Sequence, residues 1–186
     1  MVLTNLIFLI LSACNHSPEH TLFANLKPIT DTSARLIDTI SISTKSRAEK
    51  PNAEQVVEFA ETLKGINYKY GSTKPEQGFD CSGFISYVFN HFGMTVPRSS
   101  REFTNYAEEI ELKDAKRGDL ILFTGTDSTK RIVGHMGIIT SNKGQKHEFI
   151  HSTSGKAYGV TITPLNKYYE GRFVKTIRIF KEDERN

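Results

Sequence analysis

Residues 80–93 read Asp-Cys-Ser-Gly-Phe-Ile-Ser-Tyr-Val-Phe-Asn-His-Phe-Gly, and this pattern predicts a largely buried helix. From Cys81 onward the apolar residues recur at the helical period; they are Phe84, Ile85, Val88, Phe89 and Phe92. Asp80 is a favourable N-cap, and Gly93 is a typical stop signal. The pattern therefore places Cys81 in the first turn of the helix.

The flanking sequence predicts helices first and strands later. Residues Ala53 to Lys64 have helical apolar spacing before Gly65, and a third helix is expected to open at Ser99, with Glu102 completing a capping box. After Lys116, short β-branched or aromatic runs alternate with turn residues; they are Asp119–Thr124, His135–Thr140, Glu148–Ser152, Val160–Pro164 and Arg172–Phe180. This order predicts an α+β fold, with helices packed on an antiparallel β-sheet.

Composition narrows the class of protein. The chain has 186 residues, 38% of them hydrophobic and 24% charged, with a formal net charge of +3. These values exclude a disordered chain, a collagen-like fibre and a polytopic membrane protein. The charge is too small and too scattered to indicate nucleic-acid binding. The two cysteines, Cys14 and Cys81, cannot build a disulfide framework or a four-cysteine zinc site, and no close cysteine pair accompanies the histidines. A small soluble enzyme or a binding module remains.

The N-terminus has the features of a targeting segment. Residues Leu3 to Leu11 are mostly apolar, and Leu11-Ser12-Ala13-Cys14 resembles the lipobox of bacterial lipoproteins. We therefore expect residues 1–13 to be a lipoprotein signal peptide and Cys14 to carry lipid, which places the mature protein on a membrane surface outside the cytoplasm. An ordinary cleaved signal and a buried N-terminal helix are the alternatives. Residues 14–52 are expected to form a flexible tether, and residues 53–186 the folded domain.

Cys81 is either an inert core cysteine or a nucleophile. A helix N-terminus stabilises a thiolate, which predicts a pKa below the ~8.5 of free cysteine. Ser82 and Gly83 add little bulk, which suits the approach of a substrate backbone, and a thiol nucleophile needs a histidine base. His135 and His151 lie on neighbouring predicted strands, where their rings can form a hydrogen bond that fixes one tautomer. The alternative is a pair of partly buried sheet histidines.

Three blocks of the sequence resemble the signatures of NlpC/P60 cysteine peptidases. They are Phe79-Asp80-Cys81-Ser82-Gly83-Phe84, Gly134-His135-Met136-Gly137-Ile138 and Phe149-Ile150-His151-Ser152. The segments Asn67-Tyr68-Lys69-Tyr70-Gly71, Pro97-Arg98-Ser99-Ser100 and Arg117-Gly118-Asp119-Leu120 are also similar to that family. The resemblance covers the whole predicted domain and implies a papain-like core. It also implies hydrolysis of peptidoglycan stem peptides, usually between γ-D-glutamate and a diamino acid such as meso-diaminopimelate.

The same resemblance implies a role for each site residue. Cys81 would be the nucleophile, His135 the general base and acid, and His151 the residue that orients His135. Tyr68 matches a tyrosine near the nucleophile that helps to hold the substrate or the oxyanion. Asp80 and Ser82 match flanking positions that contact the substrate, and capping of the helix is their equally supported alternative.

Two other functions compete with this interpretation. His147-Glu148-Phe149-Ile150-His151 matches the H-E-x-x-H zinc signature, which requires a helix because its histidines must share one face. In a strand the same histidines are ~13 Å apart, and the flanking turn residues favour a strand. A non-catalytic lipoprotein that binds muropeptides or a partner protein is the other alternative. We expect a monomer without a metal or cofactor.

Overall fold

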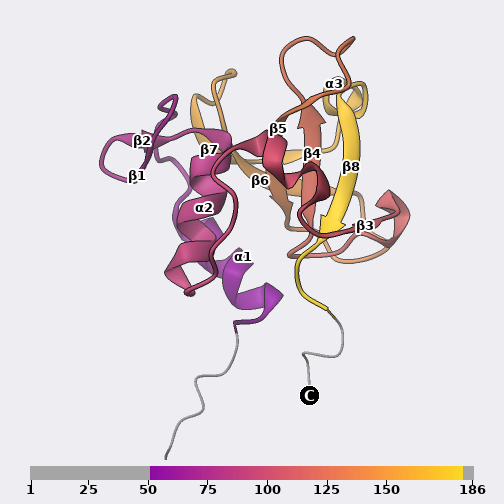
Figure 1. Cartoon of the computed structure of the whole chain (residues 1–186), viewed down its shortest axis with the longest axis horizontal. Helices are drawn as coiled ribbons and strands as arrows, with labels where there is room; N and C mark the ends of the chain where they lie inside the picture. The colour runs from indigo at the N-terminus through magenta and orange to yellow at the C-terminus, as the bar shows by residue number, and fades with distance from the viewer. Residues whose placement is uncertain (1–50, 182–186) are drawn as a thin grey trace, which may run out of the picture. The chain divides into compact units, whose positions relative to one another are not determined.

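The computed structural model describes residues 51–181, in which two short helices precede the main sheet and a third short helix lies between its last two strands in the chain (Figure 1). The helical elements are α1 (Ala53–Thr62), α2 (Cys81–His91) and α3 (Lys167–Glu170), with 3₁₀ turns at Ser100–Asn105 and Leu112–Asp114. The strands are β1 (Thr73–Lys74), β2 (Gly78–Phe79), β3 (Glu108–Ile110), β4 (Leu120–Thr124), β5 (Val133–Ile139), β6 (Glu148–Thr153), β7 (Gly159–Pro164) and β8 (Phe173–Arg178). The predicted α+β fold is confirmed.

Six strands form one antiparallel sheet in the order β3-β8-β4-β5-β6-β7. The central strands β4, β5 and β6 follow one another in the chain, whereas β8 returns from the C-terminal end to pair with β4. The strands β1 and β2 form a separate small hairpin. The sheet therefore brings the strand of His135 (β5) directly beside the strand of His151 (β6).

Alternating residues of the strands pack on opposite faces of the sheet, as the period of two requires. In β4, Leu120 and Leu122 face the core that α1 and α2 complete. Ile121 and Phe123 belong to a second, smaller cluster that also includes Phe149 and Tyr169. Both faces of the sheet centre are thus covered by apolar side chains, which fixes the positions of β4, β5 and β6.

Both start signals that the sequence predicts, the Asp80 cap and the capping box at Ser99, are present, and α1 has a further cap that was not predicted. Asn52 caps α1 through a reciprocal pair of hydrogen bonds with Gln55. The Asp80 carboxylate caps α2 by accepting from the Gly83 backbone N–H at 2.6 Å. The segment after Ser99 is a 3₁₀ helix rather than the expected third α-helix. Its buried residue is Phe103, and one apolar anchor in six residues gives little tertiary support to a longer helix.

The predicted signal peptide (residues 1–13), the lipidation site Cys14 and nearly all of the predicted tether lie outside the described residues. These three predictions stay as predictions. Within residues 51–181, no helix combines the length and the apolar character needed to cross a bilayer.

Candidate active site

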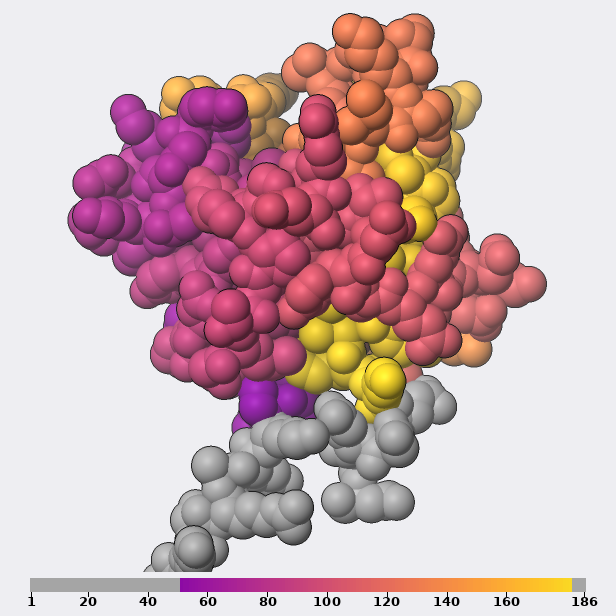
Figure 2. Space-filling model, in the orientation of Figure 1, coloured from indigo at the N-terminus to yellow at the C-terminus, as the bar shows by residue number. Residues whose placement is uncertain are grey.

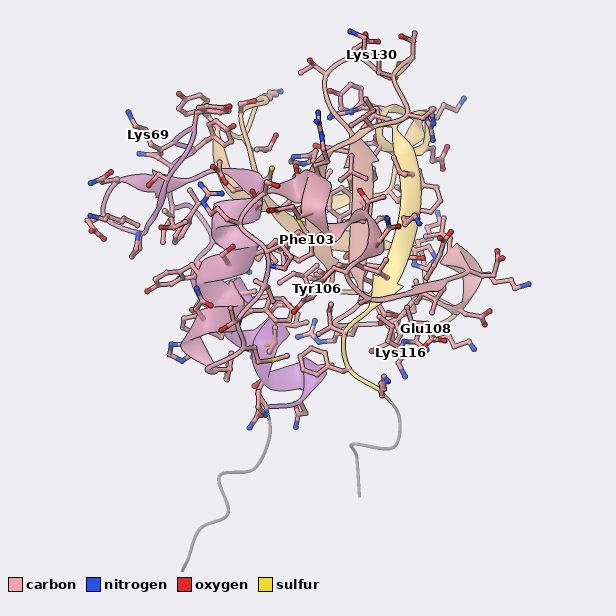
Figure 3. All side chains as sticks on the ribbon, viewed as in Figure 1. Lys69, Phe103, Tyr106, Glu108, Lys116 and Lys130 are labelled. Carbon is pink, nitrogen blue, oxygen red and sulfur yellow. The ribbon has the colours of Figure 1, made fainter. Side chains whose placement is uncertain are left out.

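Cys81 is the first residue of α2 and lines an open groove of about 1010 Å³. Its Sγ lies 3.9 Å from the carbonyl oxygen of Gly134, the residue before His135. His135 and Tyr68 line the same groove. Figure 2 shows two projections of the surface near this region: the β1–β2 segment in purple, and the loop between β4 and β5 in orange. In Figure 3, Lys69 marks the first projection and Lys130 marks the second.

The two histidines form the ring-to-ring contact that the sequence predicted. Nε2 of His135 lies 2.8 Å from Nδ1 of His151, and Nε2 of His151 lies 3.0 Å from the Thr163 hydroxyl oxygen. His135 is 9% exposed and His151 is fully buried. Each imidazole is therefore held by its neighbour.

These contacts define the tautomers that suit a base. When Nε2–H of His135 donates to Nδ1 of His151, the proton of His151 must be on Nε2, from which it donates to Thr163. Nδ1 of His135 then keeps a free lone pair. In this arrangement the free nitrogen of His135 can act as a base.

Gly137 allows β5 and β6 to approach closely enough for this contact. A Cβ on Gly137 would lie 2.7 Å from the ring of Phe149 and 2.8 Å from the carbonyl oxygen of Ile150. It would also lie 3.2 Å from Cβ of His151. A side chain at this position would push β6 and His151 away from β5.

Burial keeps both histidines neutral. It lowers the pKa of His135 well below the usual 6.5, and the electrostatic effects of the neighbouring His151 and of the Arg172 charge lower it further. Burial, followed by the charge of Arg172, lowers the pKa of His151 to about 3. A neutral His135 is competent to accept a proton at physiological pH.

The structure overturns the expectation that Cys81 titrates below a free cysteine. Burial, followed by the negative charge of Asp80, raises the pKa of the thiol to about 11. Hydrogen bonds from the backbone N–H groups of Ser82 and Cys81, and the charge of Arg98, act in the opposite direction without compensating. Removal from water disfavours the thiolate more than the first turn of α2 stabilises it. The resting pair is therefore a neutral thiol beside a neutral imidazole.

Asp80 and Ser82 belong to a network beneath the nucleophile. Arg98 donates to both oxygens of the Asp80 carboxylate, at 3.0 and 2.7 Å, and to the Ser82 hydroxyl at 3.1 Å. Asp80 is 8% exposed and Ser82 is 5% exposed, and neither lines the groove. The arrangement supports the capping role of these two residues.

Gly83 does not have the role that the sequence predicts, which is to leave room for a substrate backbone. A Cβ at Gly83 would lie 2.1 Å from the carbonyl oxygen of Ser72. The absence of a side chain serves the close packing of α2 on the segment before β1, rather than access for a substrate backbone.

Tyr68 lines the same groove as Cys81. Its ring meets Tyr158 edge to face, with ring centroids 6.0 Å apart. Burial, followed by the proximity of Cys81 and Asp80, raises the pKa of the Tyr68 hydroxyl. Tyr68 is therefore a neutral hydrogen-bond donor at the groove.

The family assignment comes from comparison with known proteins. The model of the NlpC/P60 family matches residues 65–178, more than half of the chain, and this range contains Cys81, His135 and His151. The chain belongs to the NlpC/P60 family. This confirms the resemblance seen in the three sequence blocks.

Similar proteins include peptidoglycan hydrolases of several bacteria. The gamma-DL-glutamyl hydrolase of Bacillus subtilis (strain 168) is 30% identical over 142 residues, which cover 75% of this chain and 33% of that protein. The protein named murein DD-endopeptidase MepS/murein LD-carboxypeptidase of Escherichia coli (strain K12) is 34% identical over 119 residues, covering 62% and 57%. This chain thus spans between a third and three fifths of the length of these relatives.

Solved structures of NlpC/P60 proteins share the fold. A family member from Bacillus cereus ATCC 10987 superposes with a TM-score of 0.63 at 28% identity, covering 71% of this chain and 41% of that one. The peptidoglycan hydrolase RipB from Mycobacterium tuberculosis gives a TM-score of 0.55 at 28% identity, covering 69% and 65%. The papain-like α+β core of the NlpC/P60 family is therefore the fold of this chain.

The rival zinc signature has the wrong local structure in this NlpC/P60 domain. Glu148 to His151 lie in β6, and His147 directly precedes that strand. Residues four apart in a strand are separated by ~13 Å, so His147 and His151 cannot share one metal ion. Within residues 51–181, no group of three or more His, Cys, Asp or Glu side chains is arranged to hold a metal.

Sequence reasoning missed three residues that shape the NlpC/P60 site. The Thr163 hydroxyl oxygen lies 3.0 Å from Nε2 of His151, Tyr169 packs against both histidine rings, and Arg172 places a positive charge near them. All three follow the last signature block. Only the predicted strands Val160–Pro164 and Arg172–Phe180 placed Thr163 and Arg172 in the same sheet, and no signal marked Tyr169.

Proposed function

We propose that this protein is a cysteine peptidase that hydrolyses the peptide stems of peptidoglycan. The single observation that carries the proposal is the hydrogen-bonded chain Thr163–His151–His135 beside the groove that Cys81 lines. The names of the relatives, which include a gamma-DL-glutamyl hydrolase and murein endopeptidases, support the substrate class.

Acylation begins with transfer of the thiol proton to Nδ1 of His135. The Cys81 sulfur forms a bond to the carbonyl carbon of the scissile amide, and the carbonyl electrons move to its oxygen. His135, now protonated, gives that proton to the leaving amine as the C–N bond breaks. The products of this half-reaction are a thioester on Cys81 and a free amine, and both side chains have returned to their charge in the resting state.

Hydrolysis of the thioester repeats the same steps with water. His135 accepts a proton from a water molecule as its oxygen attacks the thioester carbon, and then returns the proton to the departing Cys81 sulfur. The acid product leaves and the neutral pair is restored. His151 and Thr163 keep the ring of His135 in one orientation and one tautomer through both half-reactions.

The negative oxygen of each tetrahedral intermediate needs hydrogen-bond donors. The backbone N–H groups of Cys81 and Ser82 point toward the sulfur from the first turn of α2, and a helix N-terminus favours negative charge. The Tyr68 hydroxyl, neutral and beside Cys81 in the groove, is the side-chain donor that we assign to the substrate or the oxyanion.

We assign the scissile bond as the one between γ-D-glutamate and the diamino acid of the stem, such as meso-diaminopimelate. The name of the Bacillus subtilis relative supports this bond. The relative from Escherichia coli is named for other bonds of murein, so the bond needs a direct test.

We further propose that Cys14 is lipidated after removal of residues 1–13, which would hold a monomeric enzyme at a membrane outside the cytoplasm. Metabolic labelling with palmitate should mark the wild-type protein and fail to mark the Cys14→Ser variant. Equal labelling of both proteins would refute this anchor.

The proposed activity is tested by digestion of purified muropeptides, with mass spectrometry of the products. We expect a new amine on the diamino acid and a free γ-carboxyl on D-glutamate. Prolonged treatment with iodoacetamide at alkaline pH, where the thiolate forms, should abolish the activity, and EDTA should leave it unchanged. Binding of muropeptides without any cleavage would favour the non-catalytic lipoprotein. Inhibition by EDTA with rescue by zinc would favour the metalloprotease.

A further inference from the structure

Arg172 is a buried cation without a carboxylate partner. Arg172 is 8% exposed. Within residues 51–181, its guanidinium makes hydrogen bonds only to uncharged oxygens. It donates to the carbonyl oxygens of Gly125 at 3.1 Å and Thr124 at 2.8 Å, and to the Tyr168 hydroxyl at 2.7 Å. Burial of a charge is costly unless an opposite charge compensates it. A cation in this state at a groove is a candidate site for an anionic ligand.

The guanidinium and Tyr168 have donors left for such a ligand. Arg172 carries five N–H groups and uses one on each nitrogen, so one N–H on each terminal nitrogen remains. The Tyr168 hydroxyl accepts from Arg172, which leaves its own hydrogen to donate elsewhere. Tyr168 is 62% exposed, and both residues line the groove that contains Cys81 and His135.

Among the described residues 51–181, no negative side chain lines the groove to compensate Arg172. Its lining includes Lys156 and Arg172 as cations but no aspartate or glutamate. Asp80, which lies under Cys81, is held by Arg98 in a bidentate ion pair and does not line the groove. The field inside the groove therefore favours a substrate that carries carboxylates.

The position of Arg172 indicates which part of the substrate it meets. The helix that begins with Cys81 packs over β5 and β6. Tyr68 lies on the side of β7, because its backbone N–H donates to the carbonyl oxygen of Tyr158, the residue directly before β7. Arg172 binds the end of β4, on the opposite side of β5. His135 of β5 stands between them and must protonate the leaving amine. The residue that supplies this amine therefore lies on the side of Arg172.

We propose that Arg172 and Tyr168 form a carboxylate subsite that binds the side-chain carboxylate of the diamino acid released by cleavage. The inference rests on the proposed function and makes it more specific. A diaminopimelate stem carries this carboxylate, whereas a lysine stem or an amidated diaminopimelate stem does not. The subsite should select the first substrate over the other two.

Occupation of the subsite would also act on the base. The charge of Arg172 lowers the pKa of His135 and of His151. A bound carboxylate offsets this charge, which raises the proton affinity of His135 when the correct substrate is present. We therefore expect the carboxylate to increase kcat as well as to lower KM.

The test compares three synthetic stem tripeptides that end in meso-diaminopimelate, amidated meso-diaminopimelate or L-lysine. For the wild-type protein we expect kcat/KM to be at least about tenfold higher on the first, because hydrogen bonds to a charged group are strong. Tyr168→Phe removes the donated hydrogen, and Arg172→Lys removes the planar pair of donors. Both variants should lose most of this preference, measured as the ratio of kcat/KM on the diaminopimelate stem to kcat/KM on the lysine stem.

Tyr106→Phe is the matched control. Tyr106 is 41% exposed and its hydroxyl also makes one hydrogen bond, to the carbonyl oxygen of Thr95, but it does not line the groove. In the view of Figure 3 it lies away from Lys69 and Lys130. It should keep the wild-type preference. Equal wild-type rates on all three stems, or an unchanged preference in a folded Tyr168→Phe variant, would overturn the subsite and leave the proposed function intact. Failure of the wild-type protein to cleave any stem would refute the proposed function and the subsite together.

Discussion

Asp80 has two opposing effects on its neighbour Cys81. The Asp80 carboxylate starts the helix that presents Cys81, and the same negative charge makes the thiolate less favourable. A resting neutral thiol is protected from adventitious oxidation and alkylation, which proceed through the thiolate. In the mechanism that we propose, the nucleophile is generated only when His135 takes the proton in the presence of substrate.

This argument predicts the pH dependence of Cys81 alkylation. A thiol with a pKa of about 11 should react slowly with iodoacetamide at pH 7, and the rate should rise ~tenfold per pH unit toward pH 10 because only the thiolate reacts. Asp80→Asn keeps an N-cap oxygen but removes the charge, so it should react faster at every pH in this range. Tyr68→Phe should leave the profile unchanged in shape. A rate that levels off below pH 8 in the wild-type protein would contradict the neutral pair.

The two histidines should differ in their response to substitution. His135→Ala should lose essentially all turnover, because no other group replaces the lone pair of Nδ1. His151→Asn and His151→Gln should keep a measurable fraction, since an amide oxygen can still accept from Nε2–H of His135. Turnover of a muropeptide by each purified variant measures this difference. Complete loss in the His151 variants, with folding intact, would show that His151 does more than orient His135.

The residues of the site differ in how far the sequence could predict them. Cys81, His135 and His151 stand in short blocks whose spacing is visible in the chain. Arg172 could not be found in this way, because two of its three hydrogen-bond partners are backbone carbonyl oxygens 47 and 48 residues away. The direction in which the pKa of Cys81 shifts could not be predicted from the sequence either. The sequence indicates that Cys81 lies at a helix N-terminus, which lowers the pKa, but it does not indicate how deeply the thiol is buried.

At the scale of elements, strongly patterned segments were predictable and weakly patterned ones were not. The five predicted strands correspond to β4, β5, β6, β7 and β8. The two-residue strands β1 and β2 are too short to show any periodicity. The edge strand β3 begins with two exposed glutamates, so its hydrogen bonds with β8, rather than apolar side chains, define it.

The close approach of β5 and β6 gives a test at this scale. Gly137→Ala should destabilise the domain by about 1–3 kcal/mol, the usual cost of overpacking, and should reduce activity by moving His151 relative to His135. Gly171→Ala is a suitable control, because its new Cβ would meet nothing closer than 3.6 Å. Urea unfolding and muropeptide turnover of both variants measure the effect. A Gly137→Ala protein with wild-type stability and activity would show that the two strands can separate without loss.

For the whole molecule, the buried neutral histidines link stability to pH. The unfolded chain binds protons at these histidines below ~6.5, whereas the native state does not, because the pKa of His151 is about 3 and that of His135 is well below 6.5. The free energy of unfolding should therefore be greatest above pH 6.5 and fall as the pH decreases below it.

Urea unfolding at pH 7.5, 6.0 and 5.0 tests this linkage in a range where most carboxylates stay ionised. His151→Gln removes one of the two buried groups, so its stability should fall less between pH 7.5 and 5.0 than that of the wild-type protein. His91→Gln, at an exposed histidine at the end of α2, is the control and should follow the wild-type curve. An identical pH dependence in the wild-type and His151→Gln proteins would show that the buried pair does not destabilise the fold in acid.

The central claim is that Cys81 attacks the stem peptide and forms a thioester. Rapid mixing of the purified protein with a diaminopimelate stem peptide, followed by an acid quench and mass spectrometry, tests it most directly. We predict an adduct on the peptide that contains Cys81, with the mass of the L-alanyl-γ-D-glutamyl acyl group, which decays as free acid is released. The Cys81→Ala variant should show neither adduct nor product. Release of the same product by a Cys81→Ala protein would contradict the claim.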